Sequence, residues 1–239
     1  MILVASSPID VPAVLRRLRE SATRSTIFAV CRGPRTLLGA TPELLVSLRG
    51  QDFRSVAMAG SVARASDPAL DARLARELLQ SDKEREEHDV VVTMLRQTLA
   101  PLAEQLDMAP APEVLRLRHL QHLATPVAGR LRERASVLRL AEQLHPTPAV
   151  GGAPRDLALE LIAEEEHHQR GWYAGPLGWV DRRGDGEFVV ALRSGIVEDR
   201  TATLLAGCGI VADSEPDREW DESTAKLLAL GSALGRVQP

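Results

Sequence analysis

The sequence predicts an α+β fold in which antiparallel sheets carry helices packed on their outside. Short runs with strand-like alternation fill the segment from residue 26 to residue 58 and return after residue 175. Between and after them lie segments whose apolar residues recur every three or four positions, as in amphipathic helices. With 239 residues, of which 44% are hydrophobic and 26% charged, the chain can bury a substantial core. We expect one domain over residues 1–239.

The first strands and helices follow from local signals. Residues 26–31, 35–39, 43–48 and 53–58 are separated by glycine, proline or polar turns and read as consecutive antiparallel strands. Asp67 and Pro68 suit the N-cap and first position of a helix that ends near Gln80. Ser81 offers a second N-cap, and the apolar stripe behind it predicts a long helix to about Asp107.

The second half alternates between irregular and regular segments. Residues 109–113 are a connector, 116–129 a strand or irregular segment, and 136–144 a helix. Three prolines and two glycines in HPTPAVGGAP (145–154) exclude regular structure, so this is an ordered loop before a helix over 155–166. We then expect strands over 175–181 and 187–195 around a turn at 182–186, a strand over 201–211, and a last helix. Ser214 and Pro216 open that helix, which carries Trp220 and Leu227, Leu228, Leu230 and Leu234.

The charge and cysteine content exclude several classes of function. A net charge of −4 with acidic and basic residues interspersed creates no field that would gather nucleic acid or an anionic membrane. No basic segment precedes the short apolar start, and no apolar run approaches the roughly 18 residues of a membrane-spanning helix, so we predict a cytoplasmic protein. Cys31 and Cys208 lie far apart, which disfavours a disulfide framework or a zinc site; we predict that both are small core residues.

Two acidic windows are the clearest candidates for a metal site. In SDKEREEH (81–88), Glu84 completes a capping box with Ser81, and Glu87 lies one turn further on. In the last helix, Glu219 and Glu222 are three residues apart and share a face, with Lys226 a further turn away. Two helices of this kind can supply the hard oxygen ligands that Mg²⁺ prefers. Each window alone is equally consistent with a solvated helix face.

A third polar segment, EEEHHQR (164–170), is a weaker candidate. Glu164 and His168 are four residues apart, a spacing that zinc can use, but no third ligand follows at a suitable spacing. We predict a solvated helix end.

A series of motifs in a fixed order resembles the chorismate-utilising enzymes, and within them the isochorismate synthases. The motifs are ATPELL, AGSVAR (59–64), SDKEREEH, QHLATP (121–126), LHPTPAVGGAP (144–154), RGWYAGPLGWVD (170–181), ALR (191–193), AGCGIV (206–211) and EWDESTAKL (219–227). The resemblance extends from about residue 37 to the carboxyl end, and LHPTPAV favours the isochorismate synthases. It implies that family's fold without its N-terminal part. The implied reaction adds water at C2 of chorismate while the C4 hydroxyl departs.

The resemblance also implies roles for acidic residues. Glu43, in ATPELL, matches the general acid that protonates the leaving hydroxyl, which requires burial to raise the pKa of its carboxyl group. Glu87 and Glu222 match the Mg²⁺ ligands, with Glu84 and Glu219 as direct or water-mediated helpers. The metal would clamp the ring carboxylate of the substrate. If Glu87 and Glu222 lay on opposite sides of the molecule, this interpretation would fail.

The implied substrate contacts come from several segments. Arg193, Tyr173, Gly207 and Gly209 match the contacts of the pyruvyl carboxylate, and His122 matches the catalytic-pocket histidine beside the pyruvyl group. Gly60 and Ser61 match the loop that contacts the ring carboxylate, and Lys226 matches a further charged contact near the metal. Ala149 and Val150 match residues that line the ring of the substrate. Taken singly, these residues also suit an edge-strand arginine, a core tyrosine, turn glycines and a satisfied core histidine.

One departure from the family pattern concerns the base that activates the attacking water. In the family it is a lysine on an N-terminal strand, and here Met1 falls at or just after its position, while Lys83 and Lys226 belong to other motifs. Loss of a general base commonly costs on the order of 10²–10⁴ in rate. The alternative function is therefore a non-catalytic or weakly active chorismate-binding homologue. Missing strands also predict self-association through an uncovered sheet edge. The residues do not distinguish siderophore, menaquinone or salicylate formation as the destination of the product.

Overall fold

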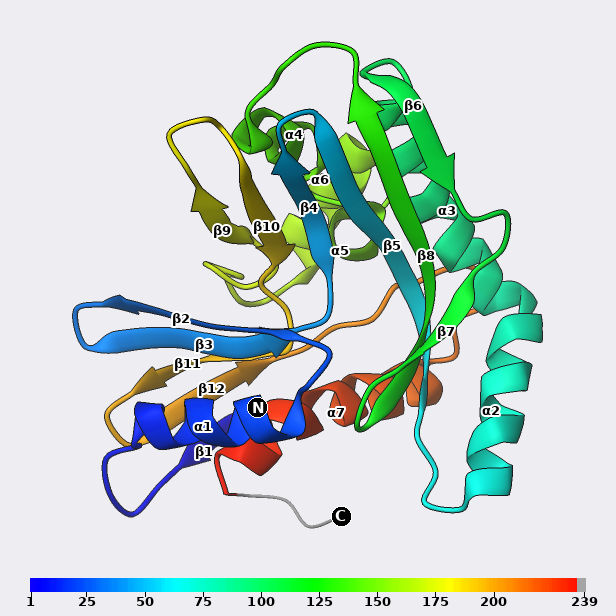
Figure 1. Ribbon diagram of the computed structural model, residues 1–239. Coiled ribbons are helices and arrows are strands. Elements are labelled where there is room, and N and C mark those ends of the chain that lie inside the picture. Colours follow the sequence, from blue (N-terminus) through cyan, green and yellow to red (C-terminus); the bar gives the residue numbers. More distant parts are fainter. Residues whose placement is uncertain (236–239) are drawn as a thin grey trace.

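The computed structural model describes residues 1–235 as two antiparallel sheets with helices on their outer faces (Figure 1). The strands are β1 (Ile2–Val4), β2 (Thr26–Arg32), β3 (Arg35–Thr41), β4 (Leu44–Arg49), β5 (Asp52–Ala63), β6 (Ala103–Met108), β7 (Glu113–Arg116), β8 (Leu120–Leu131), β9 (Pro176–Val180), β10 (Gly186–Val190), β11 (Ser194–Glu198) and β12 (Thr201–Leu205). The helices are α1 (Val11–Ser21), α2 (Pro68–Gln80), α3 (Asp82–Leu99), α4 (Val137–Leu144), α5 (Pro148–Gly151), α6 (Arg155–Glu165) and α7 (Pro216–Ala233). The predicted α+β class is confirmed.

The two sheets have separate cores. The five-stranded sheet has the order β1-β12-β11-β3-β2 and is covered by α1 and α7. Leu18 of α1 and Leu230 of α7 share its core with Leu38 of β3. The seven-stranded sheet has the order β6-β8-β5-β4-β10-β9, with β7 paired to β8, and its core gathers Phe53, Leu95 and Leu140 from the sheet, α3 and α4. Burial of these apolar side chains provides the main stabilisation of each layer. No helix within residues 1–235 is long and apolar enough to cross a membrane.

Most predicted elements are present, and Asp67 and Ser81 cap their helices as expected, whereas α7 has Glu215 at its N-cap without a side-chain cap from Ser214. The backbone N–H of Leu70 donates to Asp67 Oδ1 at 2.7 Å, and that of Glu84 donates to Ser81 Oγ at 3.4 Å. The segment left open as strand or irregular is the β7–β8 hairpin. The loop over 145–154 contains only the single helical turn α5, and the helix over 155–166 is α6. Unforeseen are β1, which pairs with β12, and α1, which Asp10 caps by accepting from Ala13 N at 3.0 Å.

Three expectations about these elements were wrong. The helix predicted to reach Asp107 ends at Leu99, because Pro101 interrupts it, and Leu102 and Leu106 reach the same core from the segment around β6. The strand predicted to reach residue 211 ends at Leu205, before a loop that contains two glycines. Cys31 is exposed on β2 instead of buried, because its strand lies at the edge of the sheet.

Candidate active site

The chain crosses between the two sheets twice, and each crossing carries a predicted site residue. Pro42 and Glu43 link β3 of one sheet to β4 of the other, and residues 191–193 link β10 to β11. The crossings are held by two backbone hydrogen bonds: Val190 N donates to Glu43 O at 3.1 Å, and Ala40 N donates to Arg193 O at 3.3 Å. Glu43 and Arg193 thereby lie at the junction of the two sheets.

Glu43 has the environment of a carboxyl group that stays protonated near neutral pH. Glu43 is only 5% exposed to solvent, and burial raises the pKa of its carboxyl group to about 7. A hydrogen bond from Thr147 Oγ1 to Glu43 Oε1 at 3.3 Å opposes the rise, as do the charges of Arg193 and Lys226. Proton donation from such a group is feasible at neutral pH.

Arg193 and His122 form the second predicted contact. Arg193 Nη2 lies 3.1 Å from His122 Nε2, and because a guanidinium group has only donors, the imidazole nitrogen accepts. Burial lowers the pKa of His122 well below its usual value, and the positive charges of Arg193 and Lys226 act in the same direction. His122 is therefore neutral, and it fixes the orientation of the arginine.

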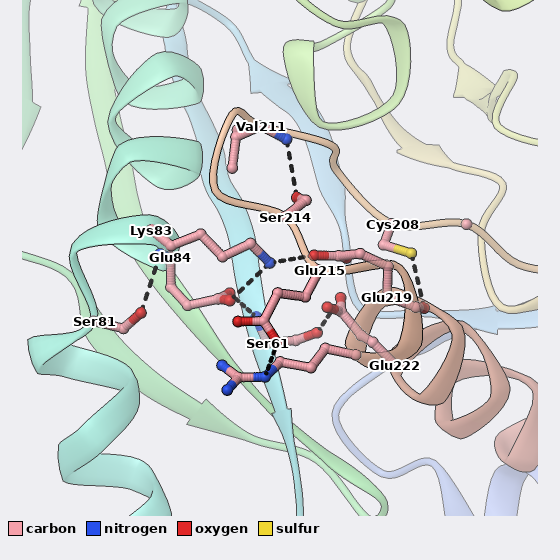
Figure 2. A network of polar contacts seen from close by, with 12 residues as sticks. Ser61, Ser81, Lys83, Glu84, Cys208, Val211, Ser214, Glu215, Glu219 and Glu222 are labelled. Carbon is pink, nitrogen blue, oxygen red and sulfur yellow. Dashed lines mark hydrogen bonds and ion pairs between the residues drawn. The ribbon is translucent and has the colours of Figure 1, made fainter.

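A bulge in β5 connects the two acidic helices. The register between β5 and β8 shifts between Ala59 and Ser61, and Gly60 has a φ of +77°, a conformation that suits glycine. Ser61 N then donates to Glu84 Oε2 at 2.9 Å, and Ser61 Oγ donates to Glu222 Oε1 at 2.6 Å. One residue of the sheet thus ties α3 to α7 (Figure 2).

Both lysines of the chain are paired with glutamates of these helices. Lys83 Nζ lies 3.2 Å from Glu84 Oε1 and 2.5 Å from Glu219 Oε1, so it bridges α3 and α7, as Figure 2 shows. Lys226 Nζ lies 2.5 Å from Glu222 Oε1 and donates to Gly207 O at 3.0 Å. For Lys83, burial alone would lower the pKa, but the hydrogen bonds and charges of its two glutamate partners outweigh burial and raise it.

The charges of neighbouring glutamates and lysines affect the pKa of Glu87. Burial raises the pKa of Glu87 to about 7; the charge of Lys226 lowers it, while those of Glu222 and Glu84 raise it further. The carboxyl group of Glu87 is therefore electrostatically coupled to those of Glu222 and Glu84.

The donor set suits a hard cation, although the carboxylates are not gathered into a ready-made cluster. Within residues 1–235, no three histidine, cysteine or acidic side chains are close enough together to hold a metal ion. Glu84, Glu219 and Glu222 are instead neutralised by Lys83 and Lys226. Among residues 1–235, Glu219 Oε2 is buried and has no hydrogen-bond partner. A buried carboxylate oxygen of this kind is a ligand that Mg²⁺ accepts.

The loop after β12 contains Gly207 and Gly209, whose lack of side chains lets its backbone come close to this site. A Cβ atom on Gly209 would overlap the carboxylate of Glu87 as it lies here, so glycine allows this side chain to lie directly against the loop. At Gly207 a Cβ atom would lie 3.8 Å from the hydroxyl of Tyr173, which is ordinary contact. Burial raises the pKa of Tyr173 to about 12, so its hydroxyl keeps its proton and can donate.

Ala149 and Val150 lie on α5, half-buried against the core of the seven-stranded sheet. Two neighbours of theirs were missed from the sequence. Thr147 contacts Glu43, and Arg170 donates to Val150 O at 2.6 Å while pairing with Glu166. Arg170 stands at the start of the RGWYAG motif, and its ion pair with Glu166 has the common i,i+4 spacing. Nothing in the spacing predicts its contact with Val150 or that of Thr147 with Glu43.

The sequence and structure match known proteins. A family described as "Chorismate binding enzyme" matches residues 1–235. The chain is 42% identical over 235 residues to isochorismate synthase MenF of Bacillus subtilis, covering 98% of this chain and 50% of that protein. It is 46% identical over 224 residues to the salicylate biosynthesis isochorismate synthase of Pseudomonas aeruginosa, covering 94% of this chain and 47% of that protein. The structure of the menaquinone-specific isochorismate synthase MenF from Escherichia coli matches with a TM-score of 0.87 and 35% identity, covering 98% of this chain and 54% of that one.

The chain belongs to the chorismate-binding enzyme family. Within that family it is similar to isochorismate synthases, and it spans about half the length of the two curated relatives named above.

Proposed function

We propose that this protein converts chorismate to isochorismate in a reaction that depends on Mg²⁺. The observation that supports this most directly is the buried carboxyl group of Glu43, with a pKa of about 7, at the junction of the two sheets. Water adds at C2 of the ring and releases a proton to solvent, while the C4 hydroxyl departs as water with the proton that Glu43 donates; Glu43 is then reprotonated from solvent.

The other residues bind and orient the substrate. The guanidinium of Arg193 and the hydroxyl of Tyr173 donate to the pyruvyl carboxylate, which Gly207 and Gly209 allow to approach the backbone. Neutral His122 holds Arg193 in place. Gly60 and Ser61 lie beside the ring carboxylate, Lys226 adds positive charge there, and Ala149 and Val150 shape the space around the ring. The chain thus recognises a dianion with fixed donors on each side.

The glutamates of α3 and α7 are the proposed Mg²⁺ ligands. Glu87 and Glu222 would hold the ion, with Glu84 and Glu219 as direct or water-mediated helpers. The buried Oε2 of Glu219, which has no hydrogen-bond partner within residues 1–235, supports this donor set. The ion would supply positive charge that clamps the ring carboxylate.

The direct test is incubation of the protein with chorismate and Mg²⁺, with chromatographic detection of isochorismate. We expect product from the unaltered protein and at least about a hundredfold less from Glu43→Gln, because a general acid contributes roughly 10²–10⁴ to the rate. A Glu43→Gln protein as active as the unaltered one would exclude Glu43 as the acid.

A second candidate function is chorismate binding without turnover. It is favoured by the state of the lysines: the sequence contains two, both are ion-paired with glutamates, and the pKa of Lys83 is raised, so neither resembles a free base. Chorismate-dependent thermal stabilisation without any isochorismate would support this alternative. Absence of both signals would contradict both candidates.

Three broader expectations accompany the proposal. Residues 1–239 act as one chorismate-binding domain, the protein works in the cytoplasm, and it needs no nucleic acid or membrane partner. Self-association is also proposed, through β1 at the edge of the five-stranded sheet, where Ile2 and Val4 are exposed.

A further inference from the structure

A cavity of about 150 Å³ adjoins the proposed active site, with which it shares Arg193 and Lys226. Its walls come from the turn between α1 and β2, the hairpin between β7 and β8, and the side of α7 that carries Ala225 and Ala229. None of the acidic residues of the proposed catalytic site lines it.

The cavity concentrates positive charge in a chain whose net charge is negative. Arg24, Arg116 and Arg118 line it, and none of the three forms an ion pair with any residue in 1–235. No aspartate or glutamate lines the cavity, whereas the whole chain carries 33 acidic against 29 basic residues. Guanidinium groups gathered without a counter-ion repel one another, and an anion placed among them relieves that repulsion.

The rest of the lining is mixed: Ser21, Thr23, Ser25 and His119 are polar, and one part of the wall is apolar. Leu117, Leu120, Ala225 and Ala229 contribute hydrocarbon surface. A dry cavity of about 150 Å³ is known to accept a benzene-sized ring, whereas drug-sized ligands need roughly 300–1,000 Å³. The lining therefore suits one ring that carries a negative charge, and it is too small for a nucleotide.

We propose that this cavity is a second binding site, for a small anion made of a single apolar ring with one carboxylate. The ring contacts the alanines of α7 and the leucines of the β7–β8 hairpin, and the carboxylate faces the arginines. This inference goes beyond the proposed function and does not depend on turnover, on Mg²⁺ or on the role of Glu43.

Two side chains connect the cavity to the proposed active site. Arg193 and Lys226 line the cavity, yet Arg193 also bonds to His122 and Lys226 also pairs with Glu222. A carboxylate in the cavity competes for the charge of these two residues. Its occupancy should therefore weaken the binding of chorismate, and by linkage chorismate should weaken its binding equally.

The test uses benzoate as the probe and isothermal titration calorimetry as the measurement. Benzamide has the same shape without the charge and is the ligand control. The variant Arg24→Gln/Arg116→Gln/Arg118→Gln removes the charge at exposed positions, so folding should be preserved. Arg182→Gln removes an exposed arginine from the turn between β9 and β10 and is the matched protein control. We expect the triple variant to bind benzoate at least about tenfold more weakly, the control variant to bind it unchanged, and benzamide to bind poorly to all three proteins.

Two results would overturn the proposal. The first is the absence of measurable benzoate binding by the unaltered protein. The second is equal benzoate affinity in the triple variant, combined with full displacement by chorismate, which would locate the anion in the catalytic site. Isochorismate formation is measured separately, so failure of the second site and failure of the proposed reaction are distinguishable.

Discussion

At the scale of single residues, Glu43 and Thr147 decide the acidity of the site together. Burial alone makes ionisation of Glu43 unfavourable, and the hydroxyl of Thr147 partly compensates by donating to the carboxylate. The sequence motif predicted Glu43 as the acid, but Thr147 lies 104 positions away and was not predicted. A hydrogen bond between distant residues cannot be read from local spacing.

Replacing Thr147 with valine should extend activity to higher pH. Thr147 lowers the pKa of Glu43, so its loss raises that pKa above about 7 and keeps the acid protonated longer as the pH rises. A net hydrogen bond of about 0.5–1.5 kcal/mol corresponds to a displacement of the alkaline limb by roughly half to one pH unit. The pH dependence of kcat measures it. Thr147→Ser keeps the hydroxyl and should behave like the unaltered protein; a valine profile displaced toward acid would contradict the assignment.

Glu43→Gln should remove activity and yet stabilise the fold at alkaline pH. The pKa of Glu43 is raised from 4.5 unfolded to about 7 folded, so its contribution is favourable below pH 4.5 and is lost as the pH rises to about 7. Glutamine cannot ionise, so the variant does not lose this contribution to stability. As the pH rises from 4.5 to 8, the free energy of unfolding of the variant should increase by about 3 kcal/mol relative to that of the unaltered protein. Urea unfolding at both pH values measures the difference, and an equal free energy of unfolding at pH 8 would show that Glu43 is not buried.

At the scale of elements, close backbone approach determines which loops can reach the site. The loop after β12 passes directly beside Glu87, and α3 is held against β5 and β8 by His88, whose ring nitrogens lie 3.3 Å from Ala59 O and 2.7 Å from Thr125 Oγ1. The helix starts were predictable because Asp67 and Ser81 are local caps. The early end of α3 illustrates the opposite case, since the leucine spacing favoured a longer helix and Pro101 overrode it.

Gly209→Ala should destabilise the protein and separate Glu87 from the loop. The added methyl group would overlap the carboxylate of Glu87, the end of a flexible side chain, which must rotate away from the loop. The cost should therefore lie at the lower end of the range for overpacking, about 1 kcal/mol. Denaturant unfolding gives the free energy. Gly207→Ala is the matched stability control two residues away, where a Cβ atom meets its nearest neighbour at 3.8 Å. Equal losses in the two variants would mean that the approach to Glu87 is not what requires glycine.

At the scale of the whole molecule, the edge strand β1 of the five-stranded sheet is the surface proposed for self-association. β1 is three residues long and lies outermost, with Ile2 68% and Val4 58% exposed. An apolar edge strand with free backbone groups is a template for pairing with another chain. The sequence predicted an uncovered edge, and only the pairing of β1 with β12 identifies which edge it is.

Ile2→Lys should reduce self-association without changing the fold. A charge on an exposed edge strand opposes pairing with a second copy. Sedimentation velocity over a range of protein concentrations should show a larger monomer fraction in the variant, with an unchanged circular dichroism spectrum. Trp220→Lys removes a 74% exposed apolar residue away from the edge and is the control. If this control alone dissociates the protein, the interface lies near α7.

The sequence by itself determined the α+β class, most element starts and the identity of the acidic, basic and glycine residues proposed for the site. These follow from short-range causes: hydrophobic period, capping, turn chemistry and ordered motifs. Only the tertiary structure decided that β3 leads to β4 and β10 to β11 across two sheets, that Ser61 joins α3 to α7, and that Lys83 bridges the two helices through Glu219. It also revealed the basic cavity, whose arginines come from separate segments. Burial and charge depend on which distant residues become neighbours, and that is fixed by the packing of the whole chain.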